Sequence, residues 1–113
     1  MTVPRNPGSP VPQEVSTELE RVVERWRQLP LDRALSYDGR VRALVQSLAD
    51  RVAEVNGVAS SVVPDLGPAT LMDQLIVMVH DASAVALTSS AVTSSAATST
   101  LAEDLASLRG ELR

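Results

Sequence analysis

The chain has 113 residues and a net charge of −4, with ten Arg, no Lys and a single His. This length allows one domain, and an apolar fraction of 44% is ordinary for a globular protein. The absence of cysteine excludes disulfides and thiolate chemistry, and the negative charge disfavours nucleic-acid binding, which requires an excess of cations.

The N-terminal residues 1–12 contain four prolines among small and polar residues. Proline fixes φ and removes a backbone donor, so this segment is predicted to be a disordered tail. A first helix is predicted from about Gln13 to Leu29, ended by Pro30. Its apolar stripe, with spacings of three and four residues, comprises Val15, Leu19, Val22, Trp26 and Leu29.

A second helix is predicted from about Asp38 or Gly39 to Asn56. Asp38 is a candidate N-cap with Ser36 as the competing one, and Asn56 with the following Gly57 is a strong stop signal. The residues before it, 31–37, are expected to form a short extra turn between the two helices.

The segment from Val58 to Pro68 is predicted to be a connector, with Pro68 opening the next helix and Thr70 with Asp73 resembling a capping box. The continuous apolar run at 75–79 fits either a buried strand or a helix that is buried on nearly all sides. We predict a central, most buried helix, because no other segment offers a pairing partner for a strand.

From Ala84 to Arg113 the apolar and small residues keep spacings of three and four. The part from Leu101 to Leu112 is predicted to be an amphipathic helix. Residues 88–100, rich in Ser, Thr and Ala, are either a closely packed helix or a flexible segment. The sequence therefore predicts an all-α fold: one helical domain over residues 13–113, a small bundle of three to four helices with antiparallel neighbours.

Residues suited to catalysis are sparse. His80, Asp81 and Ser83 are close in sequence, but adjacent helical residues point about 100° apart, so Asp81 is poorly placed to orient His80. A di-iron bundle requires a histidine one turn away from its paired carboxylates. The carboxylate pairs on the first helix lack such a histidine, so they are interpreted as solvated charges. These residues predict no catalytic site, metal site or cofactor, and the chain is interpreted as non-enzymatic, with no small-molecule substrate.

The function predicted from these features is a protein-interaction or assembly module. A domain with no Phe, one Trp and one Tyr has few large side chains for a core, so a homodimer or an obligate partner chain is expected. The heptad-like C-terminal stripe could pair with another chain as in a coiled coil. The predicted partner-binding residues are Leu87, Leu101, Leu105, Leu108 and Leu112.

Two alternatives remain open. The first is a small DNA-binding regulator that contacts phosphates through Arg33, Arg40 and Arg42, against which the overall negative charge argues. The second is a secreted protein, because the Ser/Thr/Ala-rich C-terminal half resembles the helical-hairpin substrates of type VII secretion. The chain departs from their motif, since Trp26 is followed by Arg27 and Gln28 and not by x-Gly between two helices.

The remaining expectation concerns location. The uncharged stretch from Ala82 to Ala102 is long enough to cross a bilayer, but ten of its 21 residues are Ser or Thr. It lacks the large apolar side chains that insertion requires, so no transmembrane segment is predicted. The N-terminus lacks the apolar run of a signal peptide, and a cytoplasmic location is the default expectation.

Overall fold

The computed structural model describes residues 11–88 and 91–113, and over these ranges it contains helices and connecting segments but no strand, which confirms the predicted all-α class. The predicted N-terminal tail covers residues 1–12, and of these, residues 1–10 lie outside the described residues. Five elements follow one another along the chain: α1 (Gln13–Gln28), α2 (Leu31–Val55), the 3₁₀ helix η1 (Pro68–Thr70), α3 (Leu71–Ala86) and α4 (Ala91–Glu111).

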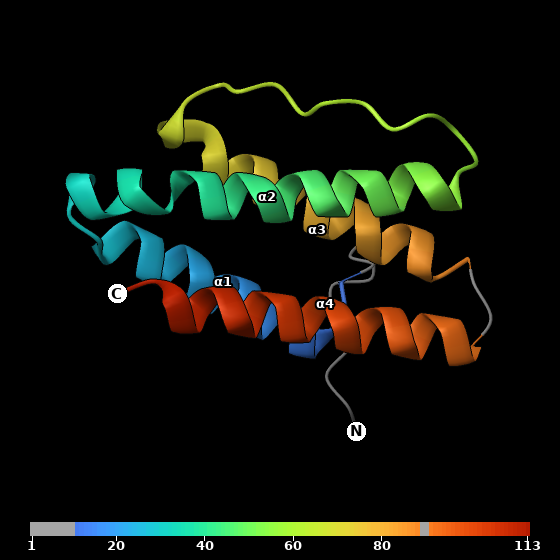
Figure 1. Cartoon of the computed structure of the whole chain (residues 1–113). Helices are drawn as coiled ribbons and strands as arrows, with labels where there is room; N and C mark the ends of the chain where they lie inside the picture. The colour runs from blue at the N-terminus through green and yellow to red at the C-terminus, as the bar shows by residue number, and fades with distance from the viewer. Residues whose placement is uncertain (1–10, 89–90) are drawn as a thin grey trace.

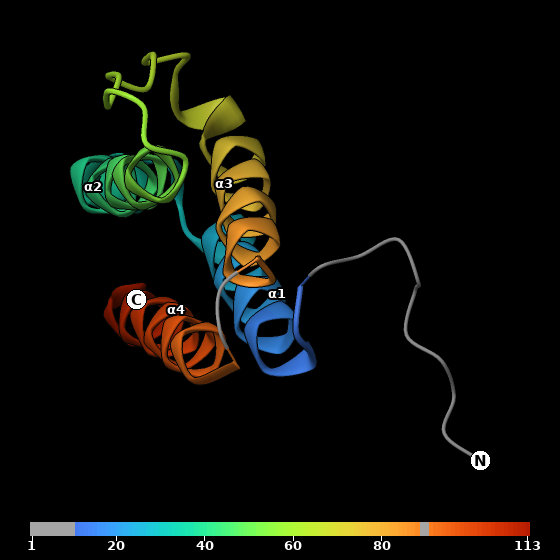
Figure 2. The same ribbon diagram turned by 90° about the vertical axis from the view of Figure 1, so that its right-hand side faces the viewer.

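The helices form two packed pairs, with α2 against α3 and α1 against α4 (Figures 1 and 2). A long connector over residues 56–67 carries the chain back along α2, so α2 and α3 run in the same direction (Figure 1). Helices α1 and α4 also run in the same direction as each other (Figure 1). The prediction of antiparallel neighbours therefore holds for consecutive helices such as α1 and α2. It is wrong for the two main packed pairs, because the connector between α2 and α3 is a crossover and not a tight turn.

The first two helices show where local signals succeeded and failed. Helix α1 ends at Gln28, as the proline signal predicts, but α2 begins at Leu31 and not near Asp38. Pro30 has extended backbone (ψ 152°) and serves as the N-cap of α2, so a single proline ends one helix and precedes the next. Asp38 lies inside α2 as an ion-pair partner and caps nothing.

The connector has glycines with positive φ near its start and at its end, Gly57 at 67° and Gly67 at 93°. These left-handed conformations are readily accessible only to glycine, and they set the two reversals of the chain. Pro68 opens η1 as predicted. The predicted capping box does not form, because Thr70 Oγ1 donates to the carbonyl of Gly67 (3.1 Å).

The ambiguous apolar run belongs to α3, so the choice of helix over strand is confirmed. The prediction that this helix is central and buried on nearly all sides is wrong, since Ile76 and Val77 are exposed. At the C-terminus, the part of residues 88–100 from Ala91 onward is helical and continues into the predicted Leu101–Leu112 helix.

One hydrophobic core joins all four α-helices. Trp26 and Tyr37 are partly buried against it, and the core itself is built from Val, Leu and one Met. Such side chains let helices approach closely. Its buried members are Val15, Val22, Val41, Leu44, Val45, Leu48, Leu71, Met72, Leu75, Val79, Leu101, Leu105, Leu108 and Leu112.

Candidate functional site

Four of the five leucines predicted to bind a partner lie in the chain's own core. Leu101 is 4% exposed, and Leu105, Leu108 and Leu112 are fully buried. In the folded monomer no partner can reach them, so this leucine stripe closes the bundle against α1 and is not a docking surface. Only Leu87, at the end of α3, is exposed.

The three arginines suggested for anion or nucleic-acid contact are all engaged within the chain. Arg33 Nη1 donates to the carbonyl of Arg113 (3.1 Å), and Arg40 Nε donates to Glu111 (2.8 Å). Arg42 bonds Asp38 on α2 (2.6 Å) and also pairs with Asp65 in the connector. The hydrogen bond to Asp38 raises the pKa of the Arg42 guanidinium above its ordinary value, although desolvation acts in the opposite direction. Ion pairs hold Arg40 and Arg42 within the chain, and a hydrogen bond to a backbone carbonyl holds Arg33.

The residues considered for catalysis do not converge. His80 and Asp81 are both exposed on α3, whereas Ser83 is buried on another side of the helix. Among the described residues no group of three or more His, Cys, Asp or Glu side chains is placed to hold a metal ion. On α1, Glu18 pairs with Arg21 and with Arg109 of α4, so it joins two helices.

The connector is fixed to α2 by side-chain hydrogen bonds. Gln46 Nε2 donates to the carbonyl of Ser61 (2.9 Å), and its Oε1 accepts from the backbone N–H of Val63 (2.8 Å). Asp50 accepts from the Ser60 hydroxyl and from Gln46, and these bonds lower the pKa of the Asp50 carboxyl. On the other side, α3 holds the connector through Gln74 Nε2 and the carbonyl of Pro64 (2.9 Å).

Fixing the connector creates an apolar groove between it and α3. The groove is lined by Val63 and Leu66 from the connector side and by Val77 and Met78 from α3. Leu66 is 62% exposed and Val77 56% exposed. Exposed apolar side chains that lie together on a protein surface are typical of interaction sites.

A second apolar groove lies between α3 and α1. Ile76, which is 40% exposed, lines it together with Leu19 and Val23 of α1. Ile76 and Val77 are adjacent on α3 and point about 100° apart, so the two grooves lie on neighbouring sides of this helix. We call Leu19, Val23, Leu66, Ile76 and Val77 together the outer α3 surface.

The charges around the outer α3 surface are mainly acidic. Helix α3 has no Lys or Arg, and its acidic residues Asp73 and Asp81 stand one turn before and after Val77. Between residues 52 and 108 the sequence has no basic residue except His80. In the groove beside α1, Arg27 is accompanied by Glu20 and Glu24.

Sequence reasoning missed this surface because an uninterrupted apolar run hides its own periodicity. Leu71, Leu75 and Val79 recur every four residues and form the buried stripe. Ile76 and Val77 lie between these positions, and helical spacing alone places them away from that stripe. Comparing each residue of the run with this spacing would have indicated an exposed apolar face.

Comparison of the chain with known protein families, with curated proteins and with solved structures found no match. Within the described parts of the chain, none of the helices is long and apolar enough to cross a membrane.

Proposed function

We propose that this chain is a non-enzymatic helical protein-interaction module that binds another protein through the outer α3 surface. The observation that carries the proposal is the groove between α3 and the connector, where Leu66 and Val77 are exposed beside Val63 and Met78. The proposal keeps the interaction role predicted from the sequence and moves the contact from the C-terminal leucines to α3.

The helix that carries the outer α3 surface is packed firmly against the core. Leu75 and Val79, on the opposite side of α3 from Val77, are fully buried in the core. The connector side is held by Gln46 and Gln74 through their hydrogen bonds to backbone atoms. A contact surface whose backbone is already ordered loses less conformational entropy when a partner binds.

The chemistry of the surface indicates a partner segment with apolar side chains flanked by Lys or Arg. An amphipathic helix of this kind would place its apolar stripe in the groove and its cations near Asp73 and Asp81. A second copy of this chain is a poorer occupant. Pairing two copies through α3 would bring their acidic residues together, and like charges across an interface disfavour association.

The test uses two synthetic amphipathic helical peptides with the same leucine stripe, one flanked by Lys and the other by Glu. Binding is followed by calorimetry and by NMR shifts of the labelled chain. We expect the Lys peptide to bind at least about tenfold more tightly and to shift the resonances of Asp73 and Val77. Tighter binding of the Lys peptide should weaken as salt increases.

A pair of matched variants makes this test specific. Val77→Asp places a charge in the groove, whereas Val58→Asp makes the same change at a 61%-exposed connector position that does not line the groove. We expect Val77→Asp to abolish binding of the Lys peptide and Val58→Asp to leave it within about twofold. Equal binding of the two peptides, or equal effects of the two variants, would contradict the proposal.

A further inference from the structure

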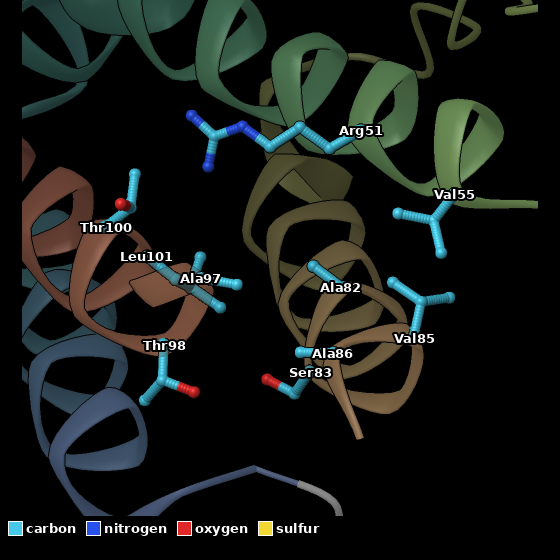
Figure 3. Close-up of a pocket in the computed structure, with 10 residues that line it drawn as sticks. All are labelled: Arg51, Val55, Ala82, Ser83, Val85, Ala86, Ala97, Thr98, Thr100 and Leu101. Carbon is cyan, nitrogen blue, oxygen red and sulfur yellow. The ribbon is translucent and has the colours of Figure 1, made fainter. Parts of the chain in front are cut away.

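A cavity of about 210 Å³ lies where the C-terminal parts of α2 and α3 meet the first half of α4 (Figure 3). Its walls are mainly apolar, and small side chains such as Ala82, Ala86 and Ala97 leave the space open. None of the residues of the outer α3 surface lines it, so it is separate from the proposed protein contact.

The cavity contains a buried hydroxyl group without a partner. Ser83 is 4% exposed, and its Oγ makes no hydrogen bond to any part of the chain that the structure describes. In Figure 3 the hydroxyls of Ser83 on α3 and Thr98 on α4 point toward one another, and both residues line the cavity. A buried polar group without a hydrogen bond is unfavourable, and a bound molecule with a matching polar group would satisfy it.

The charge at the cavity is already balanced. Arg51 lines it, but its Nη2 donates to Asp104 of α4 (2.8 Å), so the guanidinium has a carboxylate partner. An anionic ligand would have to compete with Asp104 for this cation, which favours an uncharged occupant. For size, an engineered apolar cavity of about 150 Å³ in another protein holds benzene, so this one has room for a ring and a substituent.

From these observations we propose that the cavity binds a small neutral molecule with a ring-sized apolar body and one hydroxyl or carbonyl group. The apolar body contacts the alanines, and the polar group exchanges a hydrogen bond with the Ser83 hydroxyl. This binding activity goes beyond the protein-interaction role and depends on different residues.

The test uses phenol and benzene as probes, with NMR titration of the labelled chain. Phenol is expected to bind saturably, with a Kd of roughly 1 mM or tighter, and to shift the resonances of Ser83 and Thr98. Ser83→Ala removes the hydroxyl with little change in volume. It should weaken phenol binding about threefold to tenfold without weakening benzene binding.

Two leucine variants on α4 provide the matched control. Ala97 lines the cavity and its neighbour Ala96 does not, although both are exposed on α4. Ala97→Leu should abolish binding of both probes, Ala96→Leu should preserve it, and circular dichroism verifies that each variant is folded. The proposal is overturned if phenol causes no saturable shifts up to about 10 mM. It is equally overturned if Ser83→Ala binds phenol like the wild type, or if the two leucine variants behave alike.

Discussion

The side-chain carbonyl of Gln46 accepts a hydrogen bond of 2.8 Å from the backbone N–H of Val63, joining the middle of α2 to a connector residue 17 positions later. The same side chain donates to the carbonyl of Ser61. One glutamine thus satisfies two backbone groups of a segment that has no secondary structure of its own. This attachment fixes the connector side of the outer α3 surface.

Replacing this glutamine should loosen the connector. Gln46→Ala leaves the Val63 N–H and the Ser61 carbonyl without their partner, so we expect a loss of about 1–2 kcal/mol in the free energy of unfolding. Urea denaturation measures the loss, and hydrogen exchange at Val63 should become faster. Gln28→Ala is the control, because Gln28 bonds the exposed Glu24 of its own helix and should change stability by less than about 0.5 kcal/mol. Equal losses in the two variants would contradict the assigned role.

Asp50 should make part of the stability depend on pH. Its bonds from the Ser60 hydroxyl and from Gln46 lower the pKa of the folded-state carboxyl below the ordinary 3.8. A carboxyl with a depressed folded pKa stabilises the fold above its unfolded pKa, and this contribution disappears as pH falls through the folded value. Asp50→Asn should therefore lose less stability than the wild type on acidification below about pH 4.

The comparison needs unfolding free energies of both proteins measured from neutral to acidic pH. Ser60→Ala removes the larger cause of the shift and should change the pH dependence in the same direction as Asp50→Asn. Identical pH dependence in the wild type and both variants would show that this interaction does not form in solution.

The C-terminal leucines should behave as core residues. Leu105 is fully buried and Leu87 is 64% exposed, so the same truncation has different consequences at the two positions. Leu105→Ala should cost about 2–5 kcal/mol of unfolding free energy, whereas Leu87→Ala should cost less than about 0.5 kcal/mol. Chemical denaturation measures both. A small loss at Leu105 would indicate that the leucine stripe is not packed as the structure has it.

Local signals in the sequence were sufficient for much of the fold. Helix α1 was predicted by its spaced apolar residues and by Pro30, and the end of α2 by Gly57. These features act through the backbone conformation of one or two residues, so they can be recognised without tertiary structure. The start of α2 was missed because Pro30 both ends one helix and permits the next to begin at Leu31.

What covers the C-terminal leucine stripe could not be predicted in the same way. A stripe such as Leu101, Leu105 and Leu108 indicates that a helix face is buried, but not whether it is buried by its own chain or by another. That answer depends on the long connector, which makes α2 and α3 parallel and lets α4 pack on α1. The pairings of Arg40 with Glu111 and Arg51 with Asp104 depend on the same topology and join residues far apart in sequence.

The most direct test of the central claim is the solution mass of the purified chain, measured by light scattering over a wide concentration range. The central claim is that the leucine stripe closes the chain's own core and that the acidic outer α3 surface binds a different protein. The mass should then remain that of a monomer, 12.0 kDa, at every concentration. A stable dimer that Val77→Asp dissociates would contradict this account, because it would make a second copy of the chain the occupant of the outer α3 surface.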